Sequence, residues 1–237
     1  MGKIYAGTSG WAYATWKPAF YPAKLASAKF LGYYGTRLNS VELNYTFRRR
    51  VTDKLLDGWI AATPGDFKFA VKAHQIVTHV KRLRDATQST LDFIGSLDPL
   101  REAGKLGPVL FQLPPFLKCD VALLADFLGV LPRRTRAAME FRHESWFTDE
   151  VYARLRRANV ALCEAESDKL ATPDVATADF RYFRLRKETY SAAERKAVED
   201  KVAGALKNGD VFVYFKHEDT PEGALYAESL LKAGLGS

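Results

Sequence analysis

Short apolar runs alternate with helix-like stretches along most of this chain. Eight runs have the length and hydrophobicity of strands, at residues 4–7, 40–46, 68–74, 108–113, 137–143, 160–166, 180–186 and 211–217. Such alternation predicts a parallel sheet, because each helix returns the chain to start the next strand in the same direction. Eight units favour closure of the sheet into a (β/α)8 TIM barrel, an α/β fold whose active sites lie at the carboxyl ends of the strands.

Helices are expected at residues 23–35, 53–62, 81–103, 121–130 and 149–158, where apolar residues recur at helical spacing. The seventh connection begins with Ser191 and Glu194 in the spacing of a capping box. The last begins with Thr220 as a cap and Pro221 at the first helical position. The sixth connection, 167–179, contains Pro173 and little periodicity. We therefore expect a barrel with a weak or missing helix after its sixth strand.

Features that the chain lacks exclude several classes of protein. No low-complexity linker divides it, which predicts a single domain over residues 1–237. No apolar stretch approaches the roughly 20 residues that cross a bilayer, and residues 1–10 do not resemble a secretory signal. No Gly-x-Gly-x-x-Gly pattern follows the first strand, which argues against a dinucleotide fold. Cys119 and Cys163 are far apart and predict reduced thiols in a reducing compartment.

Polar side chains recur on one face of several predicted strands. Because strand side chains alternate, Glu42 and Asn44 share one face of the second strand. Glu140 and Arg142 share one face of the fifth. The opposite faces are apolar and suit contact with helices, so the polar faces are expected to line the barrel near its carboxyl end. The set that would meet there comprises Glu42, Asn44, Lys72, Gln112, Glu140, Arg142, Arg184 and Tyr214.

This polar set has two interpretations. Buried charges need partners, and acids and bases occur together here, so one interpretation is a structural ion-pair network. The place of the set at the carboxyl ends favours the other, a ligand site. In such a site Glu42 and Glu140 would transfer protons. Lys72 would hold an anion, or form a Schiff base if its pKa is lowered. Arginines such as Arg184 suit carboxylate or phosphate.

Charge changes this picture only slightly. The net charge is +7, and basic clusters occur at residues 48–50, 81–84, 133–136 and 154–157. The simpler interpretation is a solvated surface, and the alternative is attraction to the phosphate of a metabolite or a nucleic acid. The clusters fall in separate loops and helices, which weakens the case for one nucleic-acid-binding stripe.

Histidines and aromatic residues follow several strand ends. The four histidines are His74, His79, His143 and His217. No two have helical metal-ligand spacing, so solvated or hydrogen-bonded loop histidines are favoured over a metal site. The aromatic residues after strands are Trp11, Trp16, Phe20, Tyr21, Phe47 and Trp146. Packing of the loops against the barrel and an aromatic wall for a ligand are both consistent with their positions.

Consecutive motifs along nearly the whole chain resemble one family, the domain of unknown function 72 (DUF72), also called YecE-like. They include Gly7-Thr8-Ser9-Gly10-Trp11, Val41-Glu42-Leu43-Asn44-Tyr45-Thr46-Phe47, Phe69-Ala70-Val71-Lys72, Phe111-Gln112-Leu113-Pro114-Pro115 and Glu140-Phe141-Arg142-His143-Glu144-Ser145-Trp146. The resemblance implies a TIM barrel, a cytoplasmic location and an unassigned biochemical activity. The family's polar signature residues correspond to Thr8, Ser9, Glu42, Asn44, Lys72, His79, Gln112, Glu140, Arg142, His143 and Trp146.

The carboxyl-terminal part departs from the family pattern. Arg184-Leu185-Arg186-Lys187 stands where Arg-Leu-His-Gly is usual. Lys216-His217-Glu218 stands where Asn-Asn is usual, and Phe47-Arg48-Arg49 replaces Phe-Tyr-Arg. These changes fall in loops that often bind phosphate in such barrels. Either the ligand differs here, and the added positive charge favours a more anionic one, or this member has lost part of the family's activity.

The sequence therefore leaves three functions open. The first is an enzyme that acts on a small polar or anionic metabolite, with Glu42, Lys72 and Glu140 as catalytic residues. The second is a non-catalytic protein that binds a nucleotide or nucleic acid through its basic surface, and the third is a scaffold that needs no ligand. The residues indicate no particular cofactor, reaction or oligomeric state.

Overall fold

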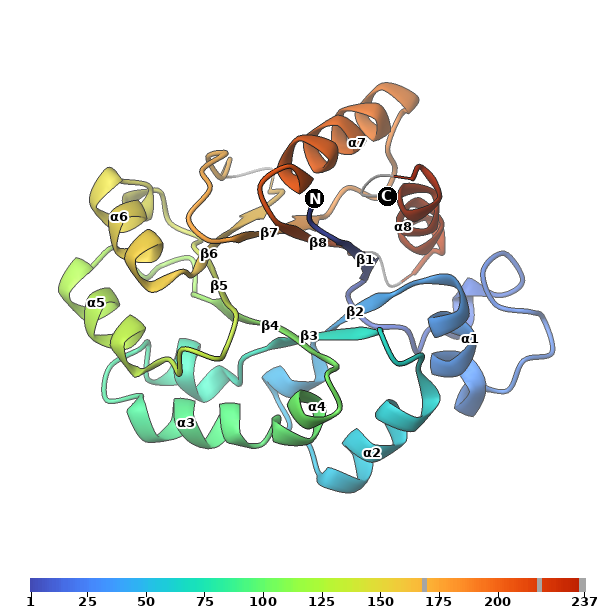
Figure 1. The fold of residues 1–237 in the computed structure, drawn as a ribbon, viewed down its shortest axis with the longest axis horizontal. Coiled ribbons are helices and arrows are strands. Elements are labelled where there is room, and N and C mark those ends of the chain that lie inside the picture. The colour runs from blue at the N-terminus through green and yellow to red at the C-terminus, as the bar shows by residue number, and fades with distance from the viewer. Residues whose placement is uncertain (168–169, 217–218, 235–237) are drawn as a thin grey trace.

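Eight parallel strands form one sheet in this computed structural model, which describes residues 1–167, 170–216 and 219–234. The strand order is β1-β8-β7-β6-β5-β4-β3-β2, and the sheet curves into a nearly closed (β/α)8 barrel (Figure 1). The strands are β1 (Ile4–Thr8), β2 (Ser40–Leu43), β3 (Lys68–Lys72), β4 (Leu106–Gln112), β5 (Ala137–Glu140), β6 (Ala161–Ala165), β7 (Phe180–Leu185) and β8 (Asp210–Phe215).

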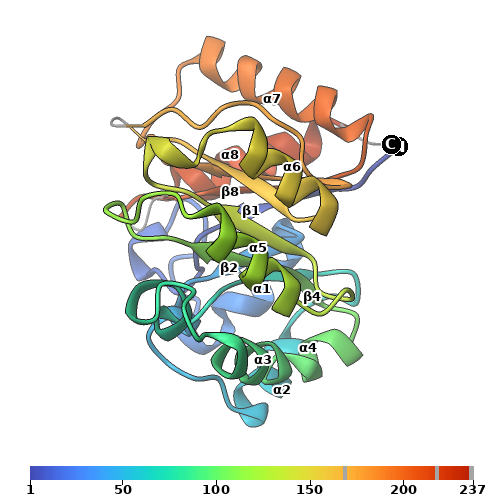
Figure 2. The same cartoon turned by 90° about the vertical axis from the view of Figure 1, so that its left-hand side faces the viewer.

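Helices surround the strands on the outside of the barrel. They are α1 (Phe30–Arg37), α2 (Asp53–Ala62), α3 (Thr87–Gly95), α4 (Asp98–Glu102), α5 (Val121–Val130), α6 (Asp149–Ala158), α7 (Ala192–Leu206) and α8 (Glu222–Lys232). Turned by 90°, the molecule shows α5 and α6 packed in front of the strands (Figure 2). Within the described ranges, no helix has the length and hydrophobicity to cross a membrane.

The alternation of strand side chains produces two separate cores. The larger core lies between the strands and the helices. The smaller one lies inside the barrel and contains Ala70, Leu110, Ala138, Ala161, Cys163, Phe180, Tyr182, Phe212 and Tyr214. Ala70 and Ala138 are in phase with Lys72 and Glu140 on the same strands. The expected inward direction of the polar face is therefore confirmed for these strands.

The barrel closes between β1 and β2 through side chains. Within the described residues, these two strands share no backbone ladder. Instead, the Asn39 side chain accepts a hydrogen bond from the Ala6 amide (2.9 Å) and donates one to the Ile4 carbonyl (2.8 Å). The Tyr34 hydroxyl accepts from the Thr8 amide and donates to the Ser40 carbonyl, both at 2.9 Å.

Glycine at position 7 permits this close approach. A Cβ atom there would lie 1.9 Å from the Ser40 carbonyl oxygen, so any other residue would separate the two strands. This contact sets the position of β2, and with it the place of Glu42 inside the barrel.

Seven of the expected strands end earlier in the structure. The runs predicted to reach residues 46, 74, 113, 143, 166 and 186 end at Leu43, Lys72, Gln112, Glu140, Ala165 and Leu185. The eighth run ends at Phe215, and His217 lies outside the described residues. The reason at β2 is local, because Asn44 adopts helical backbone angles and starts a 3₁₀ turn over Tyr45–Phe47.

The single helix expected at 81–103 was wrong. Arg82, Leu83 and Asp85 have positive φ angles, so the chain cannot be helical there. Helix α3 starts only at Thr87, and α4 restarts at Asp98 with Pro99 in its first turn. Proline has no amide hydrogen to continue the hydrogen bonds of α3, which explains the break between the two helices.

The other connections agree with expectation more closely. Helices α2, α5 and α6 have the expected bounds. The first helix was expected at 23–35 but begins at Phe30, since Ala26 is extended and a 3₁₀ turn precedes α1. The capping box of Ser191 and Glu194 is confirmed. Helix α8 begins one residue late, with Pro221 itself at the cap position and no side-chain cap bond.

The connection after β6 contains no helix in its described residues, 167 and 170–179. The expectation of a weak or missing sixth helix is therefore confirmed over that range. In Figure 1 the described part of the connection between β6 and β7 is drawn as coil, without a helix.

Replacement of Asn39 by alanine tests the closure of the barrel. The change leaves the Ala6 amide and the Ile4 carbonyl without their partners, so we expect a loss of about 2 kcal/mol in the free energy of unfolding. Urea unfolding followed by circular dichroism measures it. Asn208→Ala, at an exposed position after α7, is the control. Equal stability of the two variants would contradict a structural role for Asn39.

Candidate active site

Three ionised side chains are buried inside the barrel near the carboxyl ends of their strands. Glu42 on β2 is 0% exposed, Glu140 on β5 is 1% and Arg184 on β7 is 3%. Each lies on the inward face of its strand, between apolar neighbours that face the helices. Ionised groups at such depth require direct partners.

Arg184 joins the two carboxylates. Its NH2 group donates to Glu42 Oε1 at 2.7 Å and its NH1 group donates to Glu140 Oε2 at 2.5 Å. The guanidinium group of Arg184, on β7, therefore links β2 and β5 across the interior of the barrel. The Nε atom of Arg184 is buried and has no hydrogen-bond partner among the described residues.

Each carboxylate is also held by two further donors. Glu42 accepts hydrogen bonds from the hydroxyls of Ser9 (2.9 Å) and Tyr182 (2.7 Å). Glu140 accepts bonds from Gln112 Nε2 and Arg186 NH2, both at 2.8 Å. Ser9 comes from the end of β1, so the network collects side chains from β1, β2, β4, β5 and β7.

These contacts keep both carboxylates ionised. Burial alone would raise the pKa of Glu140, but the charges of Arg184 and Arg186 outweigh it and lower the pKa to about 2. Burial also acts to raise the pKa of Glu42, but Arg184 and the hydroxyls of Tyr182 and Ser9 lower it below its ordinary value. A carboxyl with such a pKa is not protonated near neutral pH and is a weak base, so neither group suits proton transfer there.

Lys72 lies above this network at the end of β3. Its Nζ donates to Gln112 Oε1 at 2.8 Å and lies 4.2 Å from the centre of the Phe47 ring. Among the described residues it has no ion pair. Burial and the charge of Arg184 lower its pKa to about 8, although Glu140 and Glu42 act in the opposite direction. Lys72 therefore titrates within the physiological range.

His79 and Arg142 lie near Lys72 at the mouth. Burial lowers the pKa of His79, and the charges of Lys72 and Arg142 lower it further, so these three groups share one region. The His79 ring contacts the edge of Phe47 and its Nδ1 lies 2.9 Å from the Thr78 hydroxyl. Arg142 is exposed. Asn44, at the end of β2, has a buried Oδ1 atom without a partner among the described residues.

Five other predicted site residues lie outside the network and hold local structure. The Thr8 hydroxyl donates to the Gly10 carbonyl, and Tyr214 contacts the Ser40 hydroxyl at 2.7 Å. Trp11 packs edge-on against Trp59.

The last two are His143 and Trp146. His143 accepts a hydrogen bond from the Ser145 amide and caps a 3₁₀ turn. Trp146 is 0% exposed, stacks on Phe141 and donates its indole N–H to the Leu117 carbonyl. Packing is therefore the role that its surroundings support, rather than a wall against a ligand.

Two members of the network were absent from the predicted site. Tyr182 and Arg186 are in phase with Arg184 on β7 and its continuation. That alternation was the available signal, since residues two apart on a strand share a face. Arg186 is also one of the positions that depart from the family pattern, and here its guanidinium group binds Glu140.

Metal ligands do not gather in the part of the chain that the structure describes: no group of three His, Cys, Asp or Glu side chains is close enough to hold an ion. Of the four histidines weighed as ligands, His217 lies outside the described residues. Cys119 and Cys163 are free thiols.

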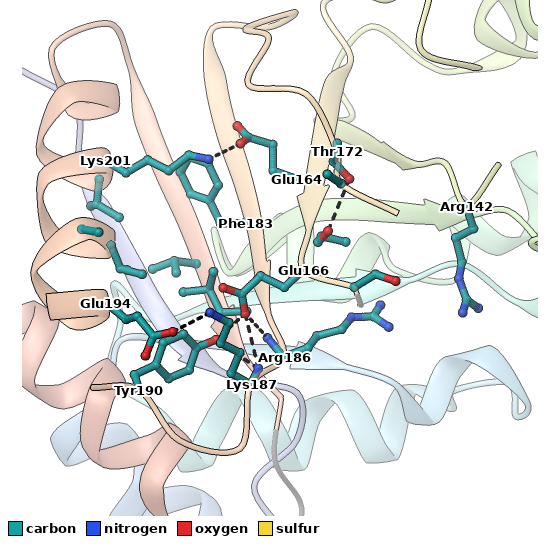
Figure 3. A pocket seen from close by; sticks show the side chains of 18 residues that line it. Arg142, Glu164, Glu166, Thr172, Phe183, Arg186, Lys187, Tyr190, Glu194 and Lys201 are labelled. Carbon is teal, nitrogen blue, oxygen red and sulfur yellow. Dashed lines mark hydrogen bonds and ion pairs between the residues drawn. The ribbon is translucent and has the colours of Figure 1, made fainter. Parts of the chain in front are cut away.

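A cavity of about 760 Å³ lies beside the barrel, where the sixth helix is missing (Figure 3). Its walls come from β6 and the described residues after it, from the outer faces of β7 and β8 and from α7, and of the polar mouth residues only Arg142 and Arg186 line it. Its carboxylates are engaged in the wall itself, as in the hydrogen bond from Lys201 to Glu164 and that from Lys187 to Glu194. We therefore place the candidate site at the mouth of the barrel.

Fold and site together define an α/β barrel protein with a buried ion network beneath its mouth. The sequence profile of the family described as "Protein of unknown function DUF72" matches residues 5–235. This chain belongs to the DUF72 family.

Related proteins agree with this assignment. UPF0759 protein YunF of Bacillus subtilis is 35% identical over 159 residues, which cover 63% of this chain and 54% of YunF, so the match spans about half of that relative. The crystal structure of a DUF72 family protein from Thermotoga maritima superposes with a TM-score of 0.86 at 29% identity and covers 98% of both chains. A DUF72 family protein from Enterococcus faecalis gives 0.77 at 18% identity and 98% coverage of both, which shows the shared fold.

Acid titration tests the state of Glu140. Its folded pKa lies below the ordinary value of 4.5, so its contribution to stability is present above about pH 5 and is lost as the pH falls towards 2. A shift of this size corresponds to about 3 kcal/mol. We expect the stability difference between wild type and Glu140→Gln to shrink from pH 6 to pH 3 in urea unfolding. A difference independent of pH would contradict the ionised state.

The lowered pKa of Lys72 can be measured directly. Competitive labelling with acetic anhydride between pH 6 and 11, followed by peptide mass spectrometry, measures the fraction of neutral amine at each lysine. We expect the Lys72 labelling curve to have its midpoint near pH 8. Because the Arg186 charge lowers this pKa, Arg186→Leu should move the midpoint upward. A curve that coincides with that of the exposed Lys54 would contradict the assignment.

Proposed function

We propose that this DUF72 protein is an enzyme that acts on a small anionic metabolite at the carboxyl end of its barrel, with Lys72 as the group that reacts or transfers a proton. The observation that carries the proposal is the contact of Lys72 Nζ with the neutral Gln112 amide, 2.8 Å away, directly above a buried network of charges. A half-buried lysine without a carboxylate partner is costly for stability, and such groups cluster at functional sites.

The charges beneath the mouth support an anionic substrate. Two carboxylates, Glu42 and Glu140, face three cations, Arg184, Arg186 and Lys72. With Lys72 protonated, the network has one positive charge in excess. Either a bound anion or loss of the Lys72 proton balances it, and both fit a site that binds an anion and moves a proton.

Glu42 and Glu140 have a different role in this proposal from the acid–base role that the sequence suggested. Both are fully bonded anions whose pKa values are lowered. Glu42 holds Arg184 in place, and Glu140 orients Gln112, which in turn orients Lys72. Their effect on the reaction would be electrostatic, through the position and the pKa of the lysine.

The positions of the basic clusters favour this function over nucleic-acid binding. Residues 48–50 and 81–84 follow β2 and β3 and lie at the mouth end of the barrel. Residues 133–136 precede β5 and 154–157 precede β6, so they lie at the opposite end. A single strand of nucleic acid would not contact both pairs of clusters along one surface stripe.

Binding of anions tests the proposal before any substrate is known. Thermal unfolding is recorded with phosphate, pyruvate or citrate against sodium chloride of equal ionic strength. A ligand at about 100 times its Kd stabilises by about 2.7 kcal/mol, so we expect at least one anion to raise the Tm by about 5 °C. Lys72→Met should abolish the shift, whereas Lys54→Met, on the exposed face of α2, should keep it.

Two results would contradict the proposal. One is a shift of equal size in both lysine variants, which would indicate a general effect of anions on a basic surface. The other is binding of a DNA or RNA duplex that weakens steeply with salt and survives Lys72→Met, in an electrophoretic mobility assay. That result would support the nucleic-acid alternative instead.

A further inference from the structure

Two poorly exposed lysines of this protein have opposite surroundings. Lys105, 5% exposed, donates to the carbonyls of Ile60 and Thr63, each at 2.7 Å, and to the Thr63 hydroxyl at 2.9 Å. Three acceptors match the three N–H bonds of an ammonium group, so Lys105 is held as a structural cation. Lys72 donates to one acceptor, the Gln112 amide oxygen.

Among the described residues, Lys72 has fewer hydrogen-bond partners than an ammonium group can use. Its Nζ donates to Gln112, and the Phe47 ring lies 4.2 Å away in a cation–π contact, which by itself favours the protonated form. Lys72 is half-buried at the end of β3, so part of its side chain is accessible at the mouth. Nearby, Arg142 is exposed and the Asn44 Oδ1 atom is buried without a partner in the described part of the chain.

The geometry points to Lys72 as a nucleophile that forms an imine with the carbonyl carbon of a small 2-oxo acid. This inference rests on the proposed function, and it names the substrate class for that site. Arg142 would bind the carboxylate of the oxo acid, for which a planar guanidinium group is the preferred partner. Its charge and that of Lys72 both act on His79, which places the three groups around one space.

The chemistry needs no oxidant or metal. The neutral Nζ attacks the carbonyl carbon, a C–N bond forms and the carbonyl oxygen takes up a proton to give a carbinolamine. The nitrogen loses a proton, and the hydroxyl group leaves as water after a second protonation, which yields the protonated imine. His79 would exchange these protons, since burial lowers its pKa and an imidazole with a lowered pKa is neutral at pH 7.

The fraction of reactive amine is sufficient for this step. With a pKa of about 8, about a quarter of Lys72 is neutral at pH 7.5, against about one part in a thousand for an ordinary lysine. Burial of the lysine is the main cause of the lowered pKa, and the charges of Arg184 and Arg186 add to it against the opposing effect of Glu140 and Glu42. Lysines activated in this way form covalent intermediates with carbonyl substrates.

Reductive trapping tests the inference. The protein is incubated with pyruvate and sodium cyanoborohydride at pH 7.5, and the secondary amine that forms is located by peptide mapping. We expect one adduct at Lys72, formed at least tenfold faster than adducts at Lys105 or the exposed Lys54. Acetone, which has the carbonyl but no carboxylate, should react more slowly, and Arg142→Gln should remove the difference between the two probes.

The outcomes separate this inference from the proposed function. Labelling spread evenly over the lysines, or no adduct at Lys72, overturns the imine. If Lys72→Met still abolishes the thermal shift caused by anions, the proposed function stands without the imine. Absence of both the adduct and the shift overturns both. Lys72→Arg, checked for folding by circular dichroism, should reduce trapping at this position to background, and the wild-type peptide map remains decisive if that variant fails to fold.

Discussion

Arg184 lies buried between Glu42 and Glu140, and the interior of the barrel is arranged around that contact. Its bonds of 2.7 Å and 2.5 Å join β7 to β2 and β5. Loss of one partner from a buried ion pair typically costs 3–5 kcal/mol, because the remaining charge is left without compensation. Such a contact constrains which side chains fit inside the barrel. The small side chains of Ala70 and Ala138 lie on the same inward strand faces as the longer side chains of Lys72 and Glu140.

The same contact determines the chemistry at the mouth. Since Arg184 and Arg186 neutralise both carboxylates, no negative charge is left over for Lys72. The lysine is instead attached to the network through the neutral Gln112 amide, and burial together with the charge of Arg184 lowers its pKa to about 8. The ion pairs of the lower part of the network thus hold Lys72 in a half-buried position without giving it a carboxylate of its own among the described residues. The two interpretations of the polar set are therefore parts of one arrangement.

Much of the fold could be predicted from local patterns. The eight strands, the bounds of α2, α5 and α6 and the gap after β6 follow from hydrophobic spacing and from Pro173. The failures occurred at turns that no glycine or proline pattern in the sequence indicated clearly. The turn with positive φ at Arg82 and Leu83 has no glycine to indicate it, and the Leu83 amide is held by the Val77 carbonyl at 3.0 Å. At the site, alternation identified Glu42, Glu140 and Arg184. Tyr182 was left out of the predicted site although it shares a strand face with Arg184, because an inward tyrosine also fits an apolar core.

The sequence by itself determined which side chains face the inside of the barrel, because the direction of a strand side chain depends only on its parity. It also determined the family, through motifs spread over the whole chain. Only the tertiary structure decided which charges pair, since Ser9, Glu42, Glu140 and Arg184 are far apart in sequence and meet only when the strands close. The same closure decided that Trp146 packs internally, while Lys72 lies at the mouth with no carboxylate partner among the described residues. Pairing and burial depend on distances in space, which side-chain parity along a strand does not encode.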